Sequence, residues 1–149
     1  MTLEKFSTFF CSGFGIGRLK YFPGTIASIS VLPIVWVIKE NFSLNLFISI
    51  IIIYTFFSIF FINHAIKKLK NKDPKFVVVD EHIGQAISLI LCEQRFFEYL
   101  IAFIIFRFFD IVKPFPINII DKKIKNSLGV ILDDILAGFY TIIFCILIF

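Results

Sequence analysis

Charged residues are scarce in this chain, which has 149 residues of which only 17% are charged while 58% are hydrophobic. Soluble domains ordinarily carry about a quarter charged residues. The composition therefore excludes a disordered tail, a collagen-like repeat and an ordinary hydrophilic globular protein. At this length it indicates one compact domain, residues 1–149, whose surface is buried or in contact with lipid.

Cysteines, linkers and targeting signals are equally sparse. The three cysteines, Cys11, Cys92 and Cys145, have no disulfide or zinc spacing, so we expect reduced thiols in apolar surroundings. No segment rich in serine or proline marks a domain boundary, and residues 1–12 lack the features of a cleavable signal peptide.

Long apolar runs are what the chain has in abundance. Residues 44–62 are 19 uncharged residues, which as a helix would extend for about 28 Å, close to the thickness of a bilayer core. Residues 25–38 and 135–149 form two further runs, whereas 83–92 and 99–106 are too short to span a bilayer and fit a core helix equally well. Such lengths favour helices over strands. We therefore expect an all-α fold, a compact helical bundle that is embedded in or bound to a membrane.

Basic residues gather in three clusters around these runs. The clusters are Arg18 with Lys20; Lys67, Lys68, Lys70, Lys72 and Lys75; and Lys122, Lys123 and Lys125. If residues 25–38 and 44–62 cross a membrane out and back, the first two clusters lie on one side, which the positive-inside rule makes cytoplasmic. Such lysines also attract anionic lipid head groups, although most of them are explained equally well as solvated charges.

Acidic residues number only 11, and six of them fall in three groups: Asp80-Glu81, Asp110 with Asp121, and Asp133-Asp134. An unpaired buried carboxylate costs several kcal/mol, so such groups are normally paired or bind a cation. Each doublet follows three aliphatic residues and precedes a glycine four residues on, which we interpret as a helix start with open space above the acid.

Two such helix starts facing each other would gather four carboxylates around one point. This predicts a carboxylate-lined site between helix N-termini, with Asp80, Glu81, Asp133 and Asp134 as the metal ligands. Oxygen ligands without a histidine or cysteine set favour Mg²⁺ over Zn²⁺. The alternative is that single acids cap the helices, although capping does not explain a doublet.

Two further segments offer groups for a phosphate. Arg107, Asp110 and Lys113 recur every three residues, so the two cations could bind phosphate while Asp110 orients them, or the three could be a simple ion-pair ladder. Residues 12–20 hold three alternate glycines and Arg18, a candidate anion-binding loop followed by Thr25 as a helix cap, or else a hinge on the membrane. Asp121 with Lys125 is interpreted as an ion pair.

Three stretches together resemble the phosphatidylglycerophosphatase A family. They are SGFGIGRLKYFPGTIAS (12–28), DPKFVVVDEHIGQ (73–85) and FRFFDIVKPFPINIIDKKIKNSLGVILDDILAGFY (106–140). The family's acidic motifs fall on Asp80, Glu81, Asp133 and Asp134, and the segment with Arg107, Asp110 and Lys113 matches as well.

The resemblance implies Mg²⁺-dependent hydrolysis of phosphatidylglycerophosphate to phosphatidylglycerol at the cytoplasmic face of a bacterial inner membrane. We expect Asp80, Glu81, Asp110, Asp133 and Asp134 as catalytic residues, and Arg107, Lys113 and Arg18 as phosphate ligands. No nucleic acid or obligate protein partner is expected. Two alternatives stay open: a non-catalytic membrane protein with an ion-binding site, and a phosphatase for another phosphomonoester.

Overall fold

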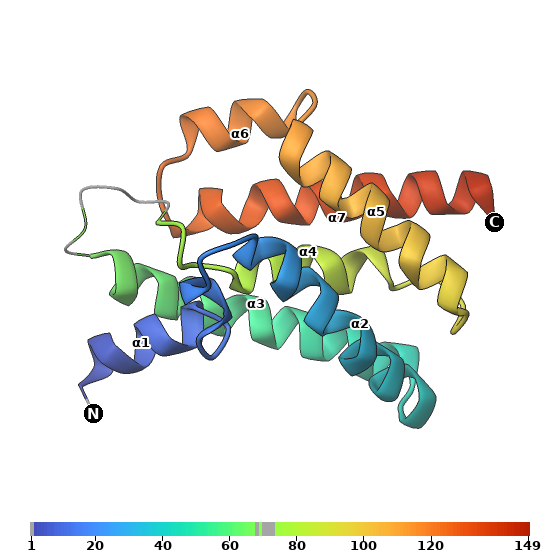
Figure 1. Cartoon of the computed structure of the whole chain (residues 1–149), viewed down its shortest axis with the longest axis horizontal. Coiled ribbons are helices and arrows are strands. Elements are labelled where there is room, and N and C mark those ends of the chain that lie inside the picture. The colour runs from blue at the N-terminus through green and yellow to red at the C-terminus, as the bar shows by residue number, and fades with distance from the viewer. Residues whose placement is uncertain (1, 68, 70–73) are drawn as a thin grey trace.

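A computed structural model describes residues 2–67, 69 and 74–149, and within these ranges the regular elements are all helices (Figure 1). In chain order they are α1 (Leu3–Cys11), the 3-10 helix η1 (Ile16–Arg18), α2 (Pro23–Asn41), α3 (Leu44–Ile66), α4 (Val79–Ser88), α5 (Phe96–Val112), α6 (Ile117–Lys123) and α7 (Ser127–Ile148). The all-α prediction is confirmed. Lys68, Lys70 and Lys72 of the second basic cluster lie outside the described residues.

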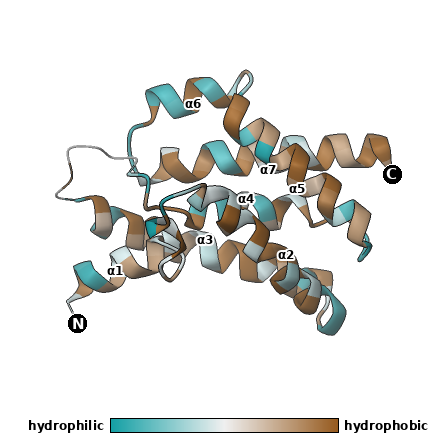
Figure 2. Cartoon of the chain, viewed as in Figure 1, coloured by the Kyte–Doolittle hydropathy of each residue, from teal (hydrophilic) through white to brown (hydrophobic). Residues whose placement is uncertain are grey.

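Three of these helices are long and apolar enough to cross a membrane, namely α2, α3 and α7. They contain the three longest apolar runs, and α2 continues through Pro33 instead of ending there. Most of their outward side chains are hydrophobic, for example Phe56 with 71% of its surface exposed and Leu147 with 78%. Figure 2 shows hydrophobic residues along the outer helices. A soluble monomer rarely exposes so much apolar surface, so this surface indicates contact with lipid.

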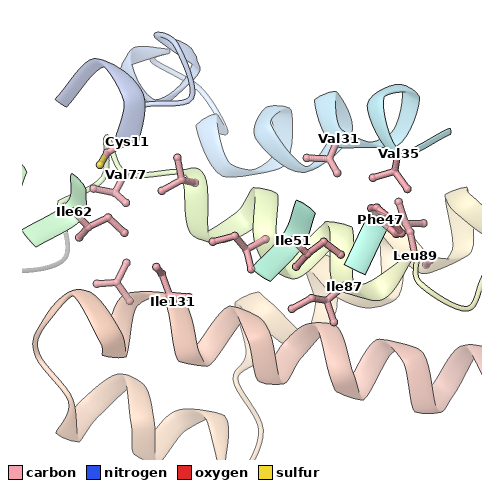
Figure 3. Close-up of a cluster of buried hydrophobic side chains, with 14 of the residues drawn as sticks. Cys11, Val31, Val35, Phe47, Ile51, Ile62, Val77, Ile87, Leu89 and Ile131 are labelled. Carbon is pink, nitrogen blue, oxygen red and sulfur yellow. The ribbon is translucent and has the colours of Figure 1, made fainter. Parts of the chain in front are cut away.

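Helix α4 is the central helix of the bundle and contacts α2, α3, α5 and α7. Its apolar side chains face these neighbours, and Figure 3 shows Ile87 between α7 and the residues Val31 and Val35 of α2. The first six residues of the apolar run 83–92 therefore belong to a core helix, one of the two interpretations of the sequence, and the run continues into the turn that follows α4. Because α4 is enclosed, side chains at its N-terminus are held in fixed positions.

Two glycines allow α4 and α7 to cross closely. A Cβ atom on Gly84 would lie 2.5 Å from the Phe106 ring and 2.7 Å from the backbone oxygen of Asp134, and one on Gly138 would lie 2.7 Å from the oxygen of Gly84. The prediction that these glycines leave open space above the acids was wrong. The space is filled by the partner helix, and this close approach brings the two acid doublets together.

Replacing Gly84 with alanine is expected to destabilise the fold by about 1–3 kcal/mol, because the new methyl group must push α7 or Phe106 away. The same displacement moves Asp134 from Asp80 and lowers any activity that depends on both. Thermal unfolding in detergent measures the first effect. An unchanged midpoint would contradict the close crossing.

The two ends of α4 are both held by α2. Beyond the C-terminus of α4, the Nζ atom of Lys39 donates hydrogen bonds to the carbonyls of Leu89 (2.9 Å), Ile90 (3.3 Å) and Cys92. At the N-terminus, Gly24 lies so close to Glu81 that a Cβ there would be 2.2 Å from its Oε1 atom. Helices α2 and α4 therefore keep one relative position along their lengths.

Candidate active site

A cavity of about 260 Å³ lies where α4 begins, between the N-terminal parts of α2 and α7 and the C-terminal end of α5. Its walls carry six carboxylates and three lysines, an excess of negative charge. The acidic residues are Asp80, Glu81, Asp110, Asp121, Asp133 and Asp134, and the lysines are Lys75, Lys113 and Lys125. A phosphate dianion would be repelled from this cavity unless a cation balanced the excess.

Three of the carboxylates form one group. Asp80, Glu81 and Asp134 each offer an oxygen, and these three oxygens lie within 4.8 Å of one another. Asp80 is only 8% exposed and Asp134 only 3%. Asp80 Oδ1 and Glu81 Oε2 are buried without a hydrogen-bond partner. Buried acceptors are normally satisfied, so unpartnered carboxylate oxygens side by side fit a missing cation.

The local sequence positions these acids through two helices. Val77 and Val78 are buried before α4, and the Val78 N–H donates to the carbonyl of Cys11, which places Asp80 and Glu81 in the first turn. Helix α7 begins earlier than the sequence predicted, because the Asn126 side chain caps it by accepting from the amides of Leu128 and Gly129. The second doublet therefore lies about two turns inside α7 and not at its N-terminus.

The electrostatics of the acidic group favour either protonation or a bound cation. Burial, followed by the charge of Glu81 and of the other nearby acids, raises the pKa of Asp80 well above its ordinary value. Burial likewise raises the pKa of Glu81, although the Arg107 guanidinium opposes the shift. A divalent cation between the carboxylates removes this repulsion and keeps them ionised.

Asp133 lines the same cavity but has other partners. Its Oδ2 atom accepts from Lys113 Nζ at 2.5 Å, and its Oδ1 atom accepts from the Asp134 amide at 3.2 Å. Lys113 Nζ also donates to Asp121 Oδ1 at 2.7 Å. The sequence analysis had paired Asp121 with Lys125 instead. Burial alone would lower the pKa of Lys113, but the hydrogen bonds to Asp121 and Asp133 outweigh it and raise the pKa.

Arg107 is held beside the three-carboxylate group by α5. Its Nη1 atom lies 2.5 Å from Asp110 Oδ2 and 3.5 Å from the Ser28 hydroxyl, while its buried Nε has no partner. Asp110 therefore orients Arg107, which lies one turn earlier on the same helix, as the three-residue spacing predicted. Lys113 does not extend this pair, because it leaves the helix in a left-handed conformation with φ of 46°.

The glycine loop does not bind at this cavity. Its amides are used in its own turns, since the N–H groups of Gly15 and Gly17 both donate to the carbonyl of Ser12. Gly17 is needed for packing instead, because a Cβ there would lie 1.9 Å from the carbonyl oxygen of Phe76. Arg18 is exposed and lines a separate hollow beside α1. Arg18 therefore does not line the acidic cavity, and its role as a phosphate ligand stays a prediction.

The structure adds residues to the site that sequence reasoning did not assign to it. Gly24 lines the cavity at the start of α2, where Phe22 is the N-cap and Thr25 makes no cap. Lys75 and Lys125, which the sequence suggested only as solvated or paired charges, are exposed at the cavity. His82 lies away from it, bonded through Nδ1 to the Tyr54 hydroxyl at 3.1 Å, and burial lowers the pKa of His82 to about 4.

Comparisons with known proteins find one matching family and several similar sequences. The model of the phosphatidylglycerophosphatase A family matches residues 9–149. Phosphatidylglycerophosphatase A of Haemophilus influenzae is 30% identical, covering 88% of this chain and 81% of the relative, and that of Escherichia coli is 29% identical, covering 85% and 73%. A Bacteroides thetaiotaomicron protein, provisionally named phosphatidylinositol-3-phosphatase, is 34% identical, covering 89% and 86%. No solved structure matches.

Proposed function

The chain belongs to the phosphatidylglycerophosphatase A family, and we propose that it hydrolyses the terminal phosphate of phosphatidylglycerophosphate, releasing phosphatidylglycerol and phosphate. The observation that carries this proposal is the group formed by Asp80, Glu81 and Asp134, which is buried, partly unpartnered and flanked by Arg107. A non-catalytic membrane protein would have no need for an oriented arginine beside such a group.

The cation that fits this group is Mg²⁺. All donors in the cluster are carboxylate oxygens, and no histidine or cysteine joins them among the described residues. Hard oxygen ligands suit Mg²⁺, which also binds phosphate oxygens readily. Asp80, Glu81 and Asp134 would hold it, while Asp133 supports the site through Lys113. When bound, the ion supplies positive charge to the phosphate and lowers the pKa of bound water.

The chain's own residues account for the remaining tasks. Arg107, oriented by Asp110, donates hydrogen bonds to phosphate oxygens and stabilises the charge that develops on them. A carboxylate of this group that the cation leaves free accepts the proton of the attacking water, and Glu81, whose Oε2 atom has no hydrogen-bond partner, is one of the two candidates together with Asp134. Lys75 and Lys125 attract the anionic head group to the cavity.

The position of the site supports a cytoplasmic location at the bacterial inner membrane. Helix α3 ends and α7 begins at the same end of the bundle (Figure 1). A hydrogen bond from the Ser127 hydroxyl to Asn63 joins these two helix ends, and the cavity lies at this end of the bundle. Several lysines lie in the chain between the end of α3 and the start of α7: Lys67 and Lys75 come after α3, and Lys122, Lys123 and Lys125 come shortly before α7. By the positive-inside rule this basic end faces the cytoplasm.

Purified protein in mixed micelles is expected to release phosphate from phosphatidylglycerophosphate with Mg²⁺ and to lose this activity in EDTA. Phosphatidylinositol 3-phosphate is the matched comparison, because the Bacteroides relative carries that name. Faster release from the inositol lipid would reassign the substrate. No release from either lipid, with Mg²⁺ still binding to the protein, would instead favour a non-catalytic ion-binding role.

A further inference from the structure

A second, apolar groove lies between α2, α3 and α4. Its volume is about 490 Å³, within the range of about 300–1,000 Å³ that is typical of small-molecule sites. One wall is formed by α2, including Ile34, and the other by α3, including Ile50. Both helices are long and apolar enough to span a membrane, so we expect lipid and not water around the groove.

The few polar groups in the groove are almost all satisfied internally. The Ser30 hydroxyl donates to the carbonyl of Ala27 at 2.7 Å, and the Tyr54 hydroxyl bonds His82 Nδ1 at 3.1 Å. The exception is His82 Nε2, which is buried without a partner. A lining of this kind suits a long hydrocarbon chain, since a polar ligand would find almost no partners.

The groove and the acidic cavity share two helices. On α4, Asp80 and Glu81 line the cavity, whereas His82 and Ile83, the next two residues, line the groove. On α2, Gly24 lines the cavity and Ser30 the groove, a separation of about 9 Å along the helix. The two sites are therefore close enough for the head group and a tail of one amphiphilic molecule to reach both.

We propose that this groove binds one acyl chain of the phospholipid substrate while the terminal phosphate lies in the acidic cavity. The inference rests on the proposed function and specifies how its substrate is held. His82 follows Asp80 and Glu81 directly in the chain and lines the groove, whereas those two acids line the cavity. Binding the tail fixes the position of the phosphate and so increases the effective concentration of the reacting group.

Two substitutions test the groove by adding bulk to its walls, Ile34→Trp on α2 and Ile50→Trp on α3. Both side chains are at the rim, 56% and 38% exposed, so the fold is expected to tolerate the change. The readout is the ratio of kcat/KM for a substrate with two 16-carbon chains to kcat/KM for the deacylated head group. We expect this ratio to fall about tenfold, chiefly through KM for the diacyl substrate.

Matched controls come from the same helices. Ile29→Trp on α2 and Ile52→Trp on α3 replace residues that are 47% and 51% exposed but do not line the groove, and they are expected to leave the ratio unchanged. An unchanged ratio in both groove variants would overturn the inference, as would an equal fall in the controls. Failure of the wild-type protein to hydrolyse either compound would instead reject the proposed function.

Photocrosslinking tests occupancy independently of turnover. A phosphatidylglycerophosphate analogue with a diazirine at the middle of one acyl chain is expected to label peptides of α2 and α3 that line the groove, and unlabelled substrate should compete. Labelling spread evenly over the lipid-facing surface of α7, or labelling that substrate does not reduce, would mean that bulk lipid and not substrate contacts the groove. Either result would overturn the inference.

Discussion

Asp80→Asn is expected to abolish Mg²⁺-dependent phosphate release, with a loss on the order of a thousandfold, and at the same time to raise the thermal midpoint of the cation-free protein. Both effects have one cause. Asp80 is buried against Glu81 and Asp134, so its negative charge is needed to bind a cation but is unfavourable without one. Asparagine has nearly the same shape and carries no charge.

Thermal unfolding with EDTA and with Mg²⁺ measures the second effect. Mg²⁺ should stabilise the wild-type protein, because a ligand that binds only the folded state shifts the unfolding equilibrium, and it should not stabilise Asp80→Asn. Glu93→Gln is a suitable control, since Glu93 is an exposed acid paired with Arg95 away from the cavity. Normal turnover in Asp80→Asn would remove Asp80 from the site.

Lys113→Met is expected to destabilise the protein by roughly 2–4 kcal/mol, because it leaves Asp133 buried without its counter-charge. Lys113 Nζ contacts Asp133 and Asp121, and the Asp133 side chain is only 7% exposed. Methionine has a side chain of similar length. Like lysine it has a Cβ atom, so the cost of the left-handed backbone at this position stays about the same and the change in stability reports the lost charge. The free energy of unfolding in detergent gives the magnitude.

A double-variant cycle separates a structural lysine from one that contacts phosphate. Lys113→Met with Asp133→Asn should recover most of the lost stability, because neither charge is then left unpaired. If Lys113 also contacts phosphate, the double variant will stay less active than Asp133→Asn alone. Equal activity of these two variants would make Lys113 purely structural.

The helices were predictable from the sequence because their signal is long and local. The uncharged run 44–62 forms the first 19 of the 23 residues of α3, and the composition allowed little except an apolar bundle. The two acid doublets could also be paired from the sequence, since a carboxylate in such surroundings needs a partner. The structure brings Asp80, Glu81 and Asp134 together as that argument requires.

What the sequence did not predict depends on contacts between distant segments. The spacing of Gly84 and Gly138 suggested open space above the acids, but only the crossing of α4 and α7 shows that each glycine accommodates a backbone. Arg18 stood beside glycines that resemble an anion-binding loop, yet their amides are used within the turns. The bond between Lys113 and Asp133 spans 20 residues, and local periodicity carries no information about it.

The attachment of α2 to α4 at both ends has a consequence for substrate selection. Gly24 is packed against Glu81 at one end, and Lys39 is bonded to the carbonyls that follow α4 at the other, so α2 cannot slide along α4 without losing one of these contacts. The interval between an anchored tail and the reacting phosphorus atom is then set by the protein. A lipid whose polar part is one glycerol shorter would leave its phosphorus short of Asp80, Glu81 and Asp134, and one that is longer would carry it past them. Head-group length then becomes a criterion for turnover.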